Sequence, residues 1–183
     1  MSPFGLAAII DLDETTHTLY VPDVNDGPVY ILDTSTCNGG TPSCSSPVIT
    51  AAQGDGIVVE RAHHSVFVVH AVDGTDQIQI LDSSTCNSTN QSQCGTPPTN
   101  SFIIDFFPTA PATVDEATHT LYLPVFFPNV LNVIDTSMCN ASTTVGCNNG
   151  GRFRLKLGVL RLCSIPKQGR SMWRTFYRPQ CPS

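Results

Sequence analysis

Short alternating runs of polar and apolar residues recur three times along the chain. Each run opens with histidine, continues in the order polar, apolar, aromatic, apolar, and follows an acid placed four residues earlier; the runs are 17–21, 64–68 and 119–123. In each repeat a second apolar run follows and ends in an acid, which is Asp33, Asp82 or Asp135. A cysteine lies four positions after each of these acids. Alternation with a period of two predicts half-buried β-strands, so the chain is predicted to be a series of repeated strands.

The spacing of the repeat indicates the architecture. The three recurring acids are 49 and 53 residues apart, and a period near 50 made of short strands is typical of a propeller blade, a four-stranded antiparallel sheet stacked on its neighbours. We therefore predict an all-β fold, a partial β-propeller of about three blades at residues 3–52, 53–106 and 107–149. In the first blade we expect strands near residues 5–10, 17–23, 28–34 and 47–52.

The third repeat carries the clearest motif, Val114-Asp-Glu-Ala-Thr-His-Thr-Leu-Tyr-Leu123 followed by Val133-Ile-Asp-Thr136. It resembles the YVTN-type β-propeller family of bacterial surface and secreted proteins, whose blades carry Val-Asp-x-x-Thr-His-Thr-Val-Tyr-Val and then Ile-Asp-Thr. The second repeat departs from this pattern at Glu60-Arg-Ala-His-His64. The resemblance covers residues 3–149 and implies the fold, but it brings no single reaction with it.

Six of the eight cysteines form closely spaced pairs in polar loops after the second apolar run of each repeat. The pairs are Cys37 with Cys44, Cys86 with Cys94, and Cys139 with Cys147. Zinc binding is the alternative, but these loops lack the usual Cys-x2–4-Cys spacing and further ligands, so we predict three disulfides. Disulfides indicate an oxidising compartment, so we expect a secreted or cell-surface protein whose signal peptide is not in this chain. The sequence contains no run of about 18 apolar residues, so it predicts no membrane span.

The charge divides the chain into two unlike parts. Residues 1–149 hold all 15 acids and a single base, whereas the tail, residues 150–183, holds eight bases, no acid and the two remaining cysteines, Cys163 and Cys181. We interpret the tail as a frameshifted or degenerate fourth blade. Two alternatives stay open: residues 152–157 form an amphipathic strand docked on the acidic part, or the tail contacts nucleic acid or an anionic membrane. We favour no nucleic-acid partner.

The recurring histidines and acids are candidates for chemistry. Histidines at equivalent positions of each repeat, His17, His64 and His119, would form a metal or catalytic site if they converged on an axis. We favour the simpler interpretation that each makes a structural hydrogen bond within its own blade. His63 and His70 are unrepeated, and we expect them at the surface or at an edge.

Acids at the ends of strands fit turn chemistry better than cation binding. Asp33, Asp82 and Asp135 precede Ser or Thr, which is typical of side-chain caps on turns. The acidic stretches 11–14 and 23–26 do not match a complete calcium loop.

Catalytic motifs are absent from the sequence: it contains no Gly-x-Ser-x-Gly, phosphate-binding loop or His-Glu-x-x-His. We therefore name no catalytic, cofactor or metal residue. The function we expect is a non-catalytic binding or scaffold module for a protein or carbohydrate ligand. A separate possibility is self-assembly, in which two three-bladed chains pair to close six blades. The alternative is part of a lactonase-like or dehydrogenase-like propeller enzyme that lacks its complete site.

Overall fold

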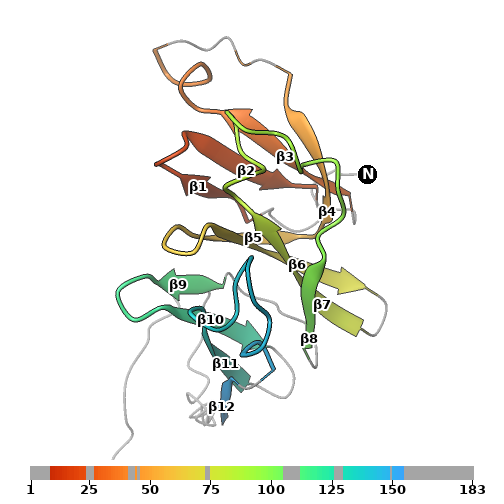
Figure 1. Ribbon diagram of the computed structural model, residues 1–183, viewed down its shortest axis with the longest axis vertical. Helices are drawn as coiled ribbons and strands as arrows, with labels where there is room; N and C mark the ends of the chain where they lie inside the picture. The colour runs from red at the N-terminus through yellow and green to blue at the C-terminus, as the bar shows by residue number, and fades with distance from the viewer. Residues whose placement is uncertain are drawn as a thin grey trace, which may run out of the picture.

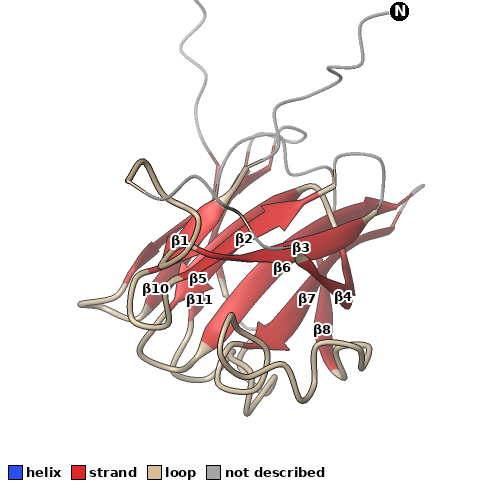
Figure 2. Ribbon diagram, turned by 90° about the horizontal axis from the view of Figure 1, so that it is seen from above, coloured by secondary structure: helices blue, strands red, loops and turns tan. Residues whose placement is uncertain are grey.

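The computed structural model describes residues 9–23, 27–40, 44, 46–72, 75–104, 112–125, 130–148 and 150–154. All regular structure in these ranges is β-strand, and the described part of the chain contains no helix (Figure 2). The all-β class predicted from the alternating runs is therefore confirmed.

The described strands form three four-stranded antiparallel sheets, in which each strand pairs with the next one along the chain. The first sheet contains β1 (Asp11–Asp13), β2 (Thr18–Pro22), β3 (Pro28–Asp33) and β4 (Val48–Gln53). The second contains β5 (Gly56–Glu60), β6 (Ser65–Val72), β7 (Thr75–Asp82) and β8 (Asn100–Ile104). The third contains β9 (Thr113–Asp115), β10 (Thr120–Val125), β11 (Val130–Asp135) and β12 (Gly151–Arg154). Among the described residues no sheet closes on itself.

The first described strand lies just after the range predicted from the apolar pattern. This strand, β1, spans Asp11–Asp13 and pairs with β2; residues 1–8, which include most of the strand predicted near 5–10, lie outside the described ranges. Ile9 pairs with the second sheet, where its carbonyl accepts the amide of Ile57 at 3.1 Å. This backbone bond joins the first two sheets, and side-chain periodicity does not encode it. The other three strands of the first sheet match their predicted ranges within one residue.

The second sheet lies between the other two, as Figure 1 shows. Its first strand, β5, is buried at every position. Successive side chains of a strand point to opposite faces of the sheet, and here one face packs on the first sheet and the other on the third. Ile57 and Val59 pack in a core shared with the first sheet, and Val58 packs in a core shared with the third. By contrast β10 alternates between half-buried and buried residues, since only one face of the third sheet is covered by described residues.

Two residues, Gly54 and Asp55, join the first sheet to the second. A Cβ on Gly54 would collide with the carbonyl oxygen of Val69 on β6, so glycine is required where the two backbones approach. This short link holds β4 of the first sheet close to the second sheet.

The third sheet takes its last strand from the predicted tail. β12, Gly151–Arg154, pairs with β11 and is exposed along its length. Residues 155–183, including Cys163 and Cys181, lie outside the described ranges. The repeat therefore extends at least four residues beyond 150 in the form of a regular edge strand.

Candidate functional site

The turn between the first and second strands has one design in all three sheets. It follows an acid, spans four residues and ends in a histidine, at residues 14–17, 61–64 and 116–119. The closing histidines, His17, His64 and His119, have φ values of 52°, 51° and 50°. Histidine adopts this left-handed conformation more readily than most residues do. The recurring histidine therefore meets a backbone requirement of the turn.

The acid before each turn accepts hydrogen bonds from the turn itself. Oδ1 of Asp13 accepts the amide of Thr15 at 2.9 Å and its hydroxyl at 2.6 Å. Glu60, which is one methylene longer, reaches one residue further, and its Oε2 accepts the amide of His63 at 2.9 Å. The longer side chain leaves Oε1 of Glu60 directed away from its own backbone turn.

Hydrogen bonds set the ionisation of Asp13. Burial acts to raise the pKa of this carboxyl, but the bonds from Thr15 and Thr16 outweigh burial and hold the pKa below its ordinary value. Asp13 is therefore a buried carboxylate that its own turn keeps charged.

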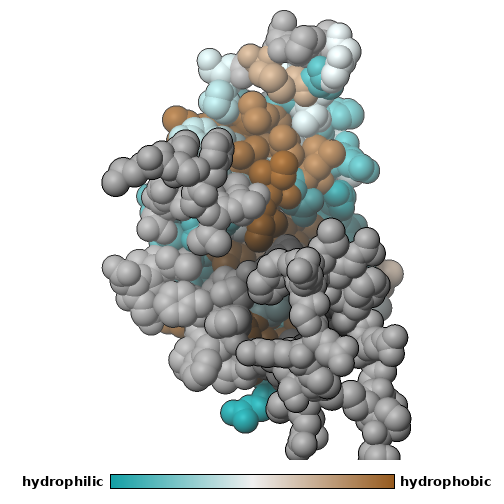
Figure 3. Space-filling view, turned by 180° about the vertical axis from the view of Figure 1, so that it is seen from behind, coloured by the Kyte–Doolittle hydropathy of each residue, from teal (hydrophilic) through white to brown (hydrophobic). Residues whose placement is uncertain are grey.

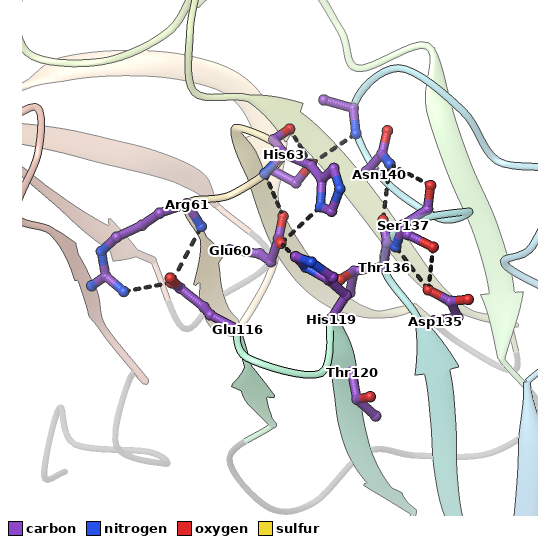
Figure 4. A network of polar contacts seen from close by, with 12 residues as sticks. Glu60, Arg61, His63, Glu116, His119, Thr120, Asp135, Thr136, Ser137 and Asn140 are labelled. Carbon is purple, nitrogen blue, oxygen red and sulfur yellow. Dashed lines mark hydrogen bonds and ion pairs between the residues drawn. The ribbon is translucent and has the colours of Figure 1, made fainter.

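Glu60, His63 and His119 form a compact cluster between the second and third sheets (Figure 4). The Glu60 side chain is 0% exposed, and its Oε1 lies 2.8 Å from Nδ1 of His63 and 3.7 Å from Nδ1 of His119. The two imidazole rings meet edge to face, with centroids 4.9 Å apart. Glu60 and His63 belong to the second sheet and its turn, whereas His119 belongs to the turn of the third. The cluster therefore exists only because these sheets stack.

A buried nitrogen without a hydrogen-bond partner among the described residues distinguishes this cluster from an ordinary hydrogen-bond network. Nδ1 of His119 is buried and makes no hydrogen bond within the described ranges, because 3.7 Å from Glu60 is too long for one. One ligand atom from each of the three side chains lies within 4.8 Å of the others, and no other such group of three occurs in the described part of the chain. Two imidazole nitrogens and a carboxylate oxygen are ligands that divalent transition metals accept.

Arg61 stands beside the cluster and links all three sheets. Its Nη1 lies 2.7 Å from Oε1 of Glu116 in the third sheet's turn, and its Nη2 donates to the carbonyl of Leu12 in the first sheet at 2.6 Å. Burial acts to lower the pKa of Arg61, but the hydrogen bond and charge of Glu116 outweigh it and raise the pKa. Because both side chains are about one third exposed, such a pair contributes at most about 1 kcal/mol to stability.

Three disulfides close the loops that follow the third strand of each sheet. They join Cys37 to Cys44, Cys86 to Cys94, and Cys139 to Cys147, which are the pairs that the spacing predicts. Those of the second and third sheets are buried in the cores between sheets. The disulfide of the first sheet is the more exposed, with Cys44 at the surface.

The second and third disulfide loops dock on the preceding sheet. The amide of Ser88 donates to Oγ1 of Thr18 at 2.9 Å, and the amide of Ala141 donates to Oγ of Ser65 at 2.8 Å. The buried hydroxyl of Tyr20 donates to the carbonyl of Cys86 at 2.9 Å. These polar loops are therefore contacts between sheets as well as local structures.

The acids at the ends of the third strands cap turns, as the sequence predicts. Oδ1 of each accepts the amide and the hydroxyl of the serine two residues later, in the pairs Asp33 with Ser35, Asp82 with Ser84, and Asp135 with Ser137. These bonds lower the pKa of Asp33 and of Asp135 below the ordinary value. The caps position the start of each disulfide loop.

Sequence reasoning did not find the cluster of Glu60, His63 and His119. The carbonyl of His119 accepts the amide of Thr136 in its own sheet at 2.8 Å, as expected, but its ring faces the second sheet. His63, expected at the surface or at an edge, is 29% exposed but bonds to a buried carboxylate. His70, for which we expected the same, is buried on β6 at 8% exposed. The available signal was the departure of the second repeat from the motif, since that departure introduces Glu60 and His63.

Comparison with known proteins finds no family model and no curated protein that matches this chain. The described residues form no helix that is long and apolar enough to cross a bilayer.

Proposed function

We propose that this chain is a β-propeller-type module of a secreted or cell-surface protein, which acts as a non-catalytic binding or scaffold unit. Three disulfides are typical of an oxidising compartment, and four-stranded meander sheets that repeat near every 50 residues are typical of propeller blades. One observation carries the proposal. The contacts by which each sheet docks on the next are repeated, and the described stack has an open docking face at each end.

The exposure of one aromatic residue in each sheet shows which face of the third sheet is left uncovered by the described residues. Tyr20 and Phe67, at equivalent positions of the first two sheets, are 0% and 1% exposed because the following sheet covers them. Tyr122 is the equivalent residue of the third sheet and is only half-buried. Its partner on β11, Val133, lines a shallow hollow together with the exposed Met138. This face therefore carries residues equivalent to those that receive a following sheet elsewhere in the stack.

The first sheet presents the opposite face. Cys86 and Cys139 are 0% exposed because their loops dock on a preceding sheet, whereas the loop of Cys37 lies at the surface. Ile49, on the same outer face as Tyr30, is 59% exposed. Figure 3, the view from behind, shows hydrophobic residues gathered in a band over the upper part of the molecule, at the height of the first sheet. An apolar face of this kind is typical of an interaction surface.

A second copy of the chain is the occupant that fits both faces, because the internal interfaces already show how they join. The first sheet of one copy would dock on the third sheet of another as the second docks on the first. Gly39, which is equivalent to Ser88 and Ala141 in its loop, would then donate its amide to Oγ1 of Thr120. Two chains would supply six sheets, within the four to eight of closed propellers, and heterologous contacts that close in this way form a ring.

The test is the molar mass in solution, measured by light scattering coupled to size-exclusion chromatography across a range of protein concentrations. We expect a mass of two chains at high concentration. Tyr122→Lys places a charge in the proposed interface and should give monomers, whereas Ile103→Lys, at a 63% exposed position on the central sheet, should not. A monomer at every concentration, or equal masses for both variants, would show that the end faces do not bind a second copy.

A further inference from the structure

We infer that Glu60, His63 and His119 form a binding site for one divalent transition-metal ion, with Zn²⁺ as its representative, at the junction of the second and third sheets. This site lies apart from the open end faces of the stack and would give the scaffold a metal-dependent clamp between two of its sheets.

The distances in the cluster suit a metal of this size. Ligands that surround zinc tetrahedrally at about 2.0–2.1 Å lie about 3.3 Å from one another. Oε1 of Glu60 lies 3.7 Å from Nδ1 of His119 and 2.8 Å from Nδ1 of His63. The first distance shortens and the second lengthens by about half an ångström each when an ion enters. The three ligand atoms lie within 4.8 Å of one another, so the two ring nitrogens would also have to approach each other as the rings rotate onto the ion.

The two oxygens of Glu60 have separate tasks. Oε2 accepts the backbone amide of His63 at 2.9 Å, which fixes the carboxylate and the turn, while Oε1 faces both rings (Figure 4). Nδ1 of His119 is buried and has no hydrogen-bond partner in the described part of the chain. An unsatisfied buried nitrogen directed at a buried carboxylate costs stability unless something bridges them. A cation ligated by both groups satisfies each of them.

The chemistry of the ligands selects the class of metal. Imidazole nitrogens favour zinc, copper and nickel, whereas calcium and magnesium require six or more oxygen ligands. Three protein ligands leave at least one position for water, and the rings of His63 and His119 are 29% and 43% exposed, so an ion can enter from solvent. The arrangement of two histidines and one glutamate with an open position matches known zinc sites in ligand type and number.

The repeat supplies an internal comparison. At the junction of the first and second sheets the corresponding positions are Asp13, Thr16 and His64, so the second imidazole is missing. Thr118 takes the place of His63 in the third repeat. Only the junction of the second and third sheets, among those described, combines the acid with two histidines.

The test is calorimetric titration of the whole oxidised chain with Zn²⁺, after chelator treatment and alkylation of any free thiol. We expect one equivalent to bind and to raise the melting temperature in a saturable manner. His63→Thr, which copies the other two repeats, and His119→Asn, which keeps a residue that tolerates positive φ, should each weaken binding about 100-fold or more, since loss of even an outer-shell partner costs 10- to 100-fold. Circular dichroism establishes that both variants are folded.

His17→Asn is the matched control, because it makes the same substitution at the same backbone conformation in a turn without the cluster. It should bind Zn²⁺ as the unmodified chain does. Co²⁺ provides a second readout, since an ion bound in tetrahedral geometry has intense visible absorption that should disappear in His63→Thr. Absence of stoichiometric binding, or unchanged binding in His63→Thr and His119→Asn, would overturn the inference. Equal loss of binding in His17→Asn would also overturn it.

Discussion

Replacement of Tyr20 by phenylalanine removes a single oxygen atom from the interface of the first and second sheets. That hydroxyl donates to the carbonyl of Cys86 at 2.9 Å, and both residues are 0% exposed. The second repeat carries Phe67 at the equivalent position, so an aromatic ring without a hydroxyl already fits this kind of interface. The substitution therefore tests the hydrogen bond with little change in packing.

The expected cost follows from burial of the acceptor. An exposed hydrogen bond is replaced by water when it is lost, but the carbonyl of Cys86 would stay buried without this donor. Such a loss costs about 1–3 kcal/mol, and we take about 1.5 kcal/mol, in the lower half of this range. For a chain of this length, about 1.5 kcal/mol corresponds to a fall in melting temperature of roughly 3–6 °C.

Urea unfolding of the oxidised chain, followed by circular dichroism at one protein concentration, measures this cost. The control is Tyr30→Phe, measured at a low protein concentration at which the chain is monomeric, because Tyr30 then lies half-buried on the outer face and water can replace any bond that it loses. We expect the control to change stability by less than about 0.5 kcal/mol. Equal stabilities for Tyr20→Phe, Tyr30→Phe and the unmodified chain would refute the reasoning that the buried bond holds the first two sheets together.

The dependence of stability on alkaline pH gives a second measurement for the Tyr20→Phe substitution. Burial, with smaller contributions from the charges of Asp13 and Asp82, raises the pKa of Tyr20 above its ordinary value. The unfolded tyrosine ionises near pH 10 while the folded one stays protonated, so its contribution to stability is present below about pH 10 and is lost as the pH rises further. Stability should therefore fall less steeply above pH 10 in Tyr20→Phe than in the unmodified chain.

The remaining predictions concern acid and reducing agents. The pKa of folded Asp13 is lowered, so its contribution to stability is present above the unfolded pKa of about 4 and is lost as the pH falls through the folded pKa. Thr15→Ala removes one of the bonds responsible, so urea unfolding between pH 6 and pH 2.5 should show a shallower acid dependence; identical slopes would contradict this. Under limited reduction, the exposed disulfide of the first sheet should open before the buried disulfide of the second, as alkylation and peptide mapping would reveal. Earlier opening of the buried disulfide would show that its docked loop gives no protection.

Local sequence patterns determined much of this fold because the contacts concerned are close along the chain. The alternation in runs such as 17–21 predicted β2 and its equivalents, since side chains of a strand point alternately to two faces. The disulfide partners are separated by seven or eight residues, and the caps at Asp33 and its equivalents reach only two residues ahead. The strand predicted near residues 5–10 lies mostly outside the described residues, and Ile9, near its end, pairs with another sheet.

Contacts between sheets were decided by the tertiary structure alone. A period-two pattern shows that a strand has two faces, but it does not show which sheet covers each face. His119 therefore looked like a turn residue of its own repeat, although its ring lies 3.7 Å from Glu60, some sixty positions earlier. Stacking places the end of β5 beside the turn that precedes β10. Side chains that are ordinary within each repeat become a cluster with metal-ligand chemistry, because their mutual distances depend on the packing of two sheets.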